Sequence, residues 1–428
     1  MIVRLPFQSR SVVVDLRGFR VHPLRPEGER GVRDVAALVR NACSSPVAGP
    51  SLAELARGKK RVALVVPDAT RWAALPEVLP EMMAVLASAG IVASRVQVIV
   101  ACGTHPAVGS SAVRALVGDG LDELRVIQHD SRQESDLEAV GSTSTGLPVR
   151  INRHVVQADL RLTVGAVRHH YFAGFGGGPK MIFPGVAGYR EIQMNHARVL
   201  DLRGGEPRRH PGCEPGRLEG NPVAEEISEA SSLCPPTAAL CLVPGVDGGF
   251  SRAIFGTPEK AFQEAVTCVR RAFEVPSEAF DLVVGSAGGS PSDNTLIQAH
   301  KGLDAVCRFL NPSGGEALFV ASLKHGPGSD DMLPFLENPD PLSILERLRN
   351  RWVQYGHTTL RIVEKTRHHT VHLVSDADRD DMARLGFHPA ASVEDVIDRW
   401  REEHAGASIG VMAGPAVYPA LLETEKRP

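Results

Sequence analysis

Short apolar runs alternate with amphipathic stretches in the first part of the chain. Arg61–Val66 and Arg95–Ala101 carry no charge after their first residue, are rich in β-branched side chains and stop at turns, which predicts buried strands. Leu75–Ala89 and Ser110–Val117 follow them with the length and spacing of helices. This β-α-β-α order favours a largely parallel sheet with helices on both faces, and such sheets bind ligands at the carboxyl ends of their strands.

The alternation continues through a glycine-dense segment. Leu160–Val167 is predicted to be a strand, and it runs into Arg168–Lys180, which we interpret as a turn. A helical stretch that carries His196 follows. The pair Asn221-Pro222 is typical of an N-cap followed by proline at the first helical position, so a helix is expected near residues 223–231.

A second β/α series begins after a helix expected at Pro258–Phe273. We therefore predict an α/β fold with two lobes, mostly parallel sheets and an active-site cleft between the lobes. The predicted domains are residues 1–272 and 273–428. The second series consists of strands at Phe280–Gly285, Glu316–Ala321, Thr370–Val374 and Ser408–Met412 and of helices at Asn294–Phe309, Pro341–Arg351 and Ser392–Glu403.

Composition and charge narrow the class of partner. The net charge is −3 and no block of consecutive basic residues occurs, which argues against nucleic acid. The 7 cysteines form no Cys-x-x-Cys pair, which disfavours a disulfide framework or a zinc ribbon and fits a reducing cytosol. There is neither a signal-peptide pattern nor an uncharged apolar stretch of about 18 residues. We expect a cytoplasmic protein with a small-molecule partner and no membrane partner.

Polar groups follow directly after the first two predicted strands. Asp68, Thr70 and Arg71 place a carboxylate, a hydroxyl and a guanidinium in one loop, and the planar guanidinium suits a carboxylate ligand. The alternative is a capped turn with a solvated arginine. His105 ends the second strand, and imidazole is suited to proton transfer near neutral pH. Such a histidine is more often structural or merely exposed.

The glycine-dense segment offers a further set of candidates. Gly176, Gly177 and Gly178 stand beside Lys180, and glycine N–H groups can approach and cradle a phosphate. The spacing is neither that of a P-loop nor that of the Rossmann fingerprint, and a flexible turn is the alternative. His196 is a candidate ligand for nickel, copper or zinc, or else a histidine on a helix surface.

In the second lobe, Gln298 and Lys301 are three residues apart, which places them on one helical face. They are candidates to bind a substrate carboxylate or carbonyl oxygen. A solvated helix face explains them equally well.

These motifs are common one by one, but their occurrence together and in this order is specific. Asp-x-Thr-Arg, Gly-Thr-His, His-x9-Lys-x15-His and Asp-x4-Gln-x2-Lys together resemble the lactate racemase family over roughly residues 1–415. The resemblance implies a nickel-pincer nucleotide cofactor, the nickel complex of pyridinium-3,5-bisthiocarboxylic acid mononucleotide. It also implies that Lys180 joins this cofactor through a thioamide, that His196 is the fourth nickel ligand, and that cofactor-biosynthesis enzymes are partners.

The resemblance further implies racemisation or epimerisation of a 2-hydroxy acid by hydride transfer to and from the cofactor. His105 and His170 match the family's two acid/base residues. The adjacent His169 competes with His170, but only His170 lies ten residues before Lys180, as in the family.

The remaining family contacts map onto both predicted lobes. Arg71, Gln298 and Lys301 match substrate-binding positions. The phosphate and ribose contacts of the cofactor map onto Asp68, Thr70 and the three glycines 176–178. The first domain is thus expected to bind the cofactor and the second to contribute substrate contacts.

The chain departs from the lactate racemase pattern at several positions. Trp72 stands where proline is common, Gly176 replaces a small hydroxyl residue, and Pro179 directly precedes the lysine. The family's second-lobe tryptophan, which covers the cofactor ring, corresponds to the region of Trp352 or His357. These differences favour a larger or more polar 2-hydroxy acid than lactate.

Two other functions are compatible with the same residues. His105, His170 and His196 supply three ligands for a zinc-dependent hydrolase, although Lys180 then has no role. A non-catalytic protein that binds a nucleotide or a sugar acid would use the glycines for phosphate and leave the histidines incidental.

Overall fold

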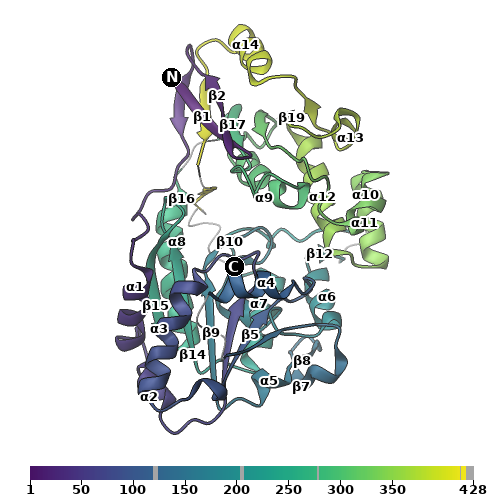
Figure 1. Cartoon of the computed structure of the whole chain (residues 1–428). Coiled ribbons are helices and arrows are strands. Elements are labelled where there is room, and N and C mark those ends of the chain that lie inside the picture. The colour runs from purple at the N-terminus through teal and green to yellow at the C-terminus, as the bar shows by residue number, and fades with distance from the viewer. Residues whose placement is uncertain (119–123, 203–206, 277–278, 415, 421–428) are drawn as a thin grey trace. The chain divides into compact units, whose positions relative to one another are not determined.

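The computed structural model describes all residues except 119–123, 203–206, 277–278, 415 and 421–428. It divides into two compact units (Figure 1). The larger comprises Gly28–Val199 and His210–Arg270, and we call it the cofactor unit after the predicted cofactor-binding residues Lys180 and His196 that it contains. The second, the C-terminal unit, comprises Met1–Glu27, Leu200–Arg209 and the residues from Arg271 onward. The sequence pattern assigns the two short segments to domain 1–272, so the structure differs there.

The cofactor unit is built on a six-stranded sheet in the order β15-β14-β9-β4-β5-β6 (Figure 1). Five strands are parallel to one another and β15 is antiparallel to β14, which confirms a mostly parallel sheet. The antiparallel edge was not predicted. The strands are β4 (Val62–Pro67), β5 (Val96–Ala101), β6 (Arg125–Gln128), β9 (Leu160–Ala166), β14 (Ala238–Pro244) and β15 (Phe250–Gly256).

The apolar runs form strands because both faces of this sheet are covered. Every residue of β4 and of β14 is buried, as expected for central strands between two layers. One face packs on helices α1–α4 in a single apolar core that includes Leu64 and Val78. On the other face, Gly165 of β9 lies against Met181 of the short 3-10 helix η3 (Gly178–Met181), the segment that carries Lys180.

The helices that the sequence predicts in the cofactor unit are present in the structure. Asn221 caps α7, accepting from the N–H groups of Val223 and Ala224 at 3.2 Å, and Pro222 occupies the first helical turn. The helices are α1 (Val35–Ser44), α2 (Leu52–Ala56), α3 (Leu75–Ser88), α4 (Ser110–Val117), α5 (Arg153–Val156), α6 (Tyr189–Ala197), α7 (Pro222–Ser232) and α8 (Pro258–Phe273). Two hairpins, β7 (Leu137–Ser142) with β8 (Pro148–Asn152) and β10 (Arg168–His170) with β11 (Gly174–Gly176), complete it.

The C-terminal unit contains a second six-stranded sheet, in the order β20-β19-β18-β17-β21-β3, and all its strands are parallel. Its strands are β3 (Arg20–Pro23), β17 (Leu282–Ser286), β18 (Glu316–Val320), β19 (Thr370–Val374), β20 (His388–Pro389) and β21 (Ser408–Met412). Its helices are α9 (Leu296–Cys307), α10 (Leu333–Leu336), α11 (Pro341–Asn350), α12 (Gln354–His368), α13 (Arg379–Arg384) and α14 (Val393–Glu403).

The N-terminus supplies part of this second core. The hairpin β1 (Ile2–Phe7) and β2 (Arg10–Asp15) packs with α14 on the sheet, and the fully buried Trp400 belongs to the same cluster. Two short strand pairs, β12 (Leu200–Asp201) with β13 (Arg208–Arg209) and β16 (Glu274–Val275) with β22 (Tyr418–Pro419), complete the unit. Among the described residues, no helix is long and apolar enough to cross a membrane.

Asn221→Ala tests the buried cap of α7. Loss of the cap and of two further hydrogen bonds, to the carbonyl oxygens of Phe172 and Arg217, is expected to lower the free energy of unfolding by about 2–3 kcal/mol. Asp34→Ala is the matched control, because Asp34 caps α1 at an exposed end and should cost only about 1 kcal/mol. Urea denaturation followed by circular dichroism measures both. Equal losses would contradict the special role of Asn221.

Candidate active site

The loop after β4 is a tight turn organised by one carboxylate. Asp68 is buried, and its Oδ1 accepts hydrogen bonds from the backbone N–H of Thr70 at 3.0 Å and from its hydroxyl at 2.7 Å. The N–H of Arg71 donates to the Asp68 carbonyl oxygen at 3.0 Å. The side chains of Thr70 and Arg71 are left at the exposed edge of the sheet. The guanidinium can therefore meet an anionic ligand from solvent.

His105, in the loop after the neighbouring strand β5, is joined to the same carboxylate. Its Nδ1 lies 2.5 Å from Asp68 Oδ2, and 28% of its side chain is exposed. Burial raises the pKa of Asp68, but the hydrogen bonds from His105 and Thr70 and the charge of Arg71 outweigh it, so the net pKa is lowered. An ionised Asp68 orients the ring and leaves Nε2 as the nitrogen for proton transfer.

His170 lies on β10, in the hairpin that the sequence pattern interprets as a turn. His170 pairs with Gly174 across the hairpin, and its Nδ1 accepts the N–H of Ala173 at 3.2 Å. The ring also meets Phe172 edge-on, with 4.7 Å between centroids. Its neighbour His169 packs on Phe175 instead, at 4.8 Å, because adjacent residues of a strand point to opposite faces. The two histidines are therefore distinct in environment.

The fold requires glycine at two of the three predicted phosphate-binding positions but not at the third. A Cβ at Gly177 would lie 2.8 Å from the carbonyl oxygen of Ala166, and one at Gly178 would lie 2.2 Å from the ring of Phe262. Both also have positive φ, so the fold itself requires glycine there. A Cβ at Gly176 would meet only the carbonyl oxygen of Arg168, at 3.8 Å. Its missing side chain leaves room that the chain does not use.

Lys180 sits in η3 with a partly buried side chain. Its Nζ lies 5.7 Å from the centroid of the Phe172 ring. Burial, and then the positive charge of Arg71, lower the pKa of Lys180 to about 7. In the part of the chain that the structure describes, no carboxylate lies within ion-pair distance of this amine. Near neutral pH, the amine of Lys180 is therefore neutral and nucleophilic in a substantial share of the protein molecules.

His196 is buried on α6. Burial, and then the nearby charge of Lys180, lower its pKa to about 3, so the ring is neutral. Its Nδ1 lies 3.1 Å from Asn195 Oδ1, and its ring meets Phe172 edge-on at 5.2 Å. Phe172 therefore contacts His170, Lys180 and His196 together. Neither Phe172 nor Asn195 carries a sequence signal, because one matches ordinary core and the other an ordinary helix surface.

The candidate residues of the C-terminal unit lie on α9 and at the start of α12. Lys301 Nζ donates to Gln298 Oε1 at 2.7 Å, so the two share one helical face as their spacing predicts. His357 is fully buried, and burial holds its pKa well below the ordinary value. The rings of Trp352 and His357 lie 5.5 Å apart. Both residues of the predicted ring-covering region are therefore neighbours.

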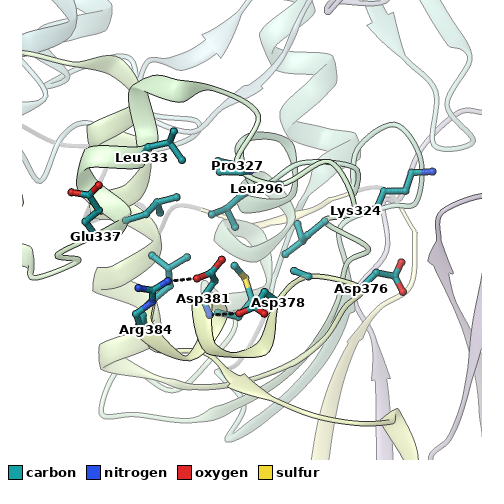
Figure 2. Close-up of a pocket in the computed structure, with 15 residues that line it drawn as sticks. Leu296, Lys324, Pro327, Leu333, Glu337, Asp376, Asp378, Asp381 and Arg384 are labelled. Carbon is teal, nitrogen blue, oxygen red and sulfur yellow. Dashed lines mark hydrogen bonds and ion pairs between the residues drawn. The ribbon is translucent and has the colours of Figure 1, made fainter.

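A cavity of about 510 Å³ lies in the C-terminal unit, beside the start of α9 (Figure 2). Leu296 and Leu323 form part of its apolar wall. Two of its acidic groups are engaged locally, since Asp381 pairs with Arg384 and Asp378 caps α13 by accepting the N–H of Asp381 at 2.9 Å. None of the predicted site residues lines this cavity.

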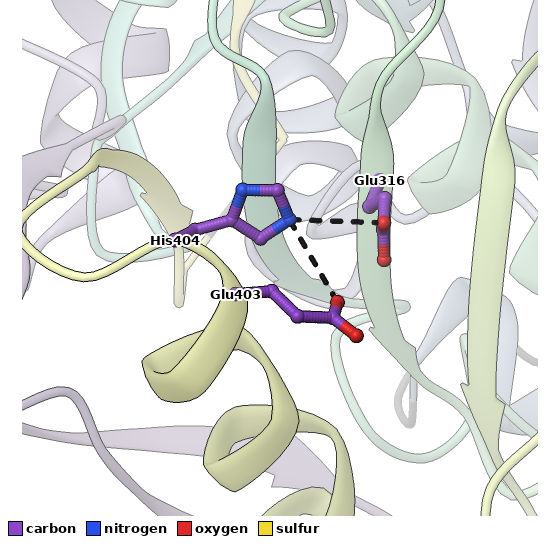
Figure 3. A group of neighbouring side chains, drawn as sticks. All are labelled: Glu316, Glu403 and His404. Carbon is purple, nitrogen blue, oxygen red and sulfur yellow. Dashed lines mark ion pairs between the residues drawn. The ribbon is translucent and has the colours of Figure 1, made fainter.

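One cluster of the described residues has metal-ligand geometry. His404 Nε2 lies 4.0 Å from Glu316 Oε1 and 4.0 Å from Glu403 Oε2 (Figure 3). Glu316 Oε2 already accepts from Trp400 Nε1 at 2.7 Å and from Arg399 at 2.8 Å. This oxygen is therefore used by hydrogen bonds to a buried tryptophan and to an arginine of the same chain.

The three histidines of the hydrolase alternative show no such geometry. Among the residues that the structure describes, His105, His170 and His196 do not form a group whose ligand atoms all lie within 4.8 Å of one another. A three-histidine zinc site of this kind is therefore not formed in this structure.

Comparison with known proteins gives consistent matches. Residues 12–205 match the model of the lactate racemase N-terminal domain. The chain is 29% identical to a lactate racemase of Thermoanaerobacterium thermosaccharolyticum over 323 residues, which cover 73% of this chain and 72% of the relative. It is 26% identical to a lactate racemase of Lactiplantibacillus plantarum over 387 residues, covering 87% and 88% of the two chains.

Solved structures show the same architecture. The lactate racemase apoprotein of T. thermosaccharolyticum superimposes with a TM-score of 0.87 at 23% identity, covering 98% of this chain and 99% of that one. A protein from Thermotoga maritima superimposes with a TM-score of 0.62 at 14% identity, covering 90% and 97%. The similarity to these structures shows the fold. With the sequence matches, it leads to one conclusion: residues 12–205 match a lactate racemase N-terminal domain, and the chain is similar over most of its length to lactate racemases, which are isomerases.

Proposed function

We propose that this isomerase racemises or epimerises a 2-hydroxy acid other than lactate, and that it uses a nickel-pincer nucleotide. The observation that carries the proposal is the convergence of His170, Lys180 and His196 on the ring of Phe172. The predicted base, the predicted attachment point and the predicted metal ligand thus share one small, partly buried region. Neither a hydrolase nor a passive binder explains a low-pKa lysine at its centre.

The donor set fits the implied cofactor. His196 is neutral, and its Nδ1 is engaged by Asn195, which leaves Nε2 as the donor for a metal. Lys180 is the group that would hold the cofactor, because a neutral amine is the nucleophile that attachment through a thioamide would need. Gly176 is the least crowded of the three glycines, since a Cβ there would meet nothing closer than 3.8 Å.

A bound nickel-pincer nucleotide would supply the centre that exchanges hydride with the substrate's α-carbon. The chain must then hold the acid and move the hydroxyl proton. Because the product enantiomer is formed from the opposite face, two bases are required. His105, oriented by Asp68 at 2.5 Å, is one, and His170 is the other.

Arg71, Lys301 and Gln298 are the residues assigned to substrate binding. Arg71 is exposed at the end of β4 and offers a planar fork to the carboxylate. Lys301 and Gln298, joined at 2.7 Å, are assigned to the hydroxyl or carbonyl oxygen. Trp72 beside Arg71 and His357 in the ring-covering region favour an acid larger or more polar than lactate. The cofactor-biosynthesis enzymes are the expected protein partners, and the cytoplasm is the expected location.

His170→Ala is expected to abolish racemisation without loss of nickel, because the residue moves a proton and binds no metal. His169→Ala is the matched control on the other face of the same strand and should keep most of the activity. Chiral chromatography over a panel of 2-hydroxy acids measures the first effect, and elemental analysis the second. Full activity in His170→Ala would exclude it as a base.

Asp68→Asn should lower kcat by about 10²- to 10⁴-fold, because an amide no longer fixes the tautomer and orientation of His105. The loss must be equal in kcat/KM for both directions of a racemisation, since two enantiomers have the same free energy. Initial rates with each pure enantiomer measure it. If Asp68 served only the cofactor phosphate, the variant would lose bound cofactor with little change in the kcat of the loaded fraction.

Lys180→Ala and His196→Ala distinguish the proposed cofactor from a zinc site. After co-expression with the cofactor-making enzymes, the wild type should hold one nickel per chain and show a visible absorption band. Both variants should lose nickel on dialysis, because each removes one attachment. Zinc-dependent hydrolysis that survives Lys180→Ala, or a wild type that stays nickel-free, would reject the proposal.

A further inference from the structure

The side chain next to the predicted nickel ligand has a fixed orientation. The amide nitrogen of Asn195 donates to the carbonyl oxygen of Val223 at 3.2 Å and to Glu226 Oε2 at 3.0 Å. Both partners are acceptors, so the NH2 end of the amide must face them. The oxygen Oδ1 is then the end that meets His196 Nδ1, at 3.1 Å.

Glu226 holds the amide of Asn195 in this orientation. Its carboxylate is buried on α7 and also accepts from Arg198 Nε at 2.6 Å and from the hydroxyl of Thr145. Arg198 and Thr145 are both donors to this carboxylate, so its oxygens act as acceptors. If the amide of Asn195 turned over, its oxygen would face the carbonyl oxygen of Val223 and the carboxylate of Glu226, and both hydrogen bonds would be lost. Asn195 itself is fully buried, and water therefore does not supply a substitute partner.

The consequence for His196 is a single ring tautomer. A carbonyl oxygen 3.1 Å from Nδ1 favours a proton on that nitrogen, because two facing lone pairs would repel. A neutral imidazole carries one proton, so Nε2 is left with its lone pair. The other tautomer would place hydrogen on Nε2 and block metal binding there.

We propose that Asn195 is a positioning residue that holds His196 in the Nδ1-protonated tautomer, and that Glu226 fixes the orientation of Asn195. The cofactor-related part rests on the proposed function, because it assigns Nε2 of His196 to nickel. The tautomer itself depends only on the residues of this chain. A chain of three side chains, from Glu226 on α7 to His196 on α6, thus prepares the ligand before the metal arrives.

The decisive measurement is the tautomer of His196 in the metal-free protein. Long-range proton–nitrogen correlation spectra of protein labelled with ¹⁵N-histidine distinguish the two ring nitrogens, and loss of signals in His196→Gln assigns them. The wild type should show a protonated Nδ1 and an unprotonated Nε2. A proton on Nε2 in the wild type overturns the inference whether or not the protein ever binds nickel.

Variants then test the role of Asn195. Asn195→Ala should give a mixture of tautomers and, in the nickel-loaded protein, about 10- to 100-fold faster loss of nickel to a chelator. Met194→Ala is the matched control, because Met194 is exposed on the same helix. If Asn195→Ala does not fold, Asn195→Ser, whose hydroxyl is too short to reach Nδ1, replaces it.

The outcomes separate the two proposals. An unchanged tautomer in Asn195→Ala, or equal nickel loss in Asn195→Ala and Met194→Ala, contradicts the role of Asn195. Absence of nickel from every variant including the wild type contradicts the proposed function, while the tautomer spectra still decide on Asn195.

Discussion

The candidate site depends on how one buried amide holds one aromatic ring. Asn221 donates to the carbonyl oxygen of Phe172 at 2.9 Å while its oxygen caps α7 at 3.2 Å. This ties the β10–β11 hairpin to the start of a helix. Phe172 then provides the surface on which His170, Lys180 and His196 lie. Since ring and amide are both buried, the three groups have little freedom to move apart.

Burial and like charge shape the chemistry of this region. Burial lowers the pKa of both Lys180 and His196, and the charge of Arg71 adds to the effect on the lysine while the charge of Lys180 adds to the effect on the histidine. Asp68 interacts with the charge of Arg71, and it is committed to His105 and Thr70. A region with more basic than acidic groups suits an anionic ligand. Under the proposed function, a nucleotide phosphate and a substrate carboxylate are such ligands.

The sequence predicts those parts of the fold that depend on local pattern. Buried strands such as β4 are visible as uncharged apolar runs, and α7 is visible from Asn221-Pro222. The edge strand β3 is not visible, because Arg20 pairs with Ser408 across almost the whole chain. The short β10–β11 pair is hidden because glycines that usually mark a turn here allow close backbone packing.

The same division holds for the site. Residues with reactive side chains, such as His105 and Lys180, stand out by type and by their place after strands. Asn195, Glu226 and Phe172 do not stand out. Asn and Glu are common on helix surfaces and Phe is common in cores, so these residue types carry no signal in the sequence. What distinguishes them is burial together with specific partners, and both come from contacts between distant segments.

Exposure separates the residues that fix the chemistry from those that meet the substrate. His196, Asn195 and Glu226 are buried, and Asn195 is hydrogen-bonded to the other two, so a change in any one disturbs the chain of contacts. Trp72 instead is 52% exposed and lies flat on the buried ring of Phe250, with 4.6 Å between centroids. A substitution at such a surface costs little stability. Under the proposed function, a family with one buried chemical centre can therefore change its acid by changing the exposed positions beside Arg71.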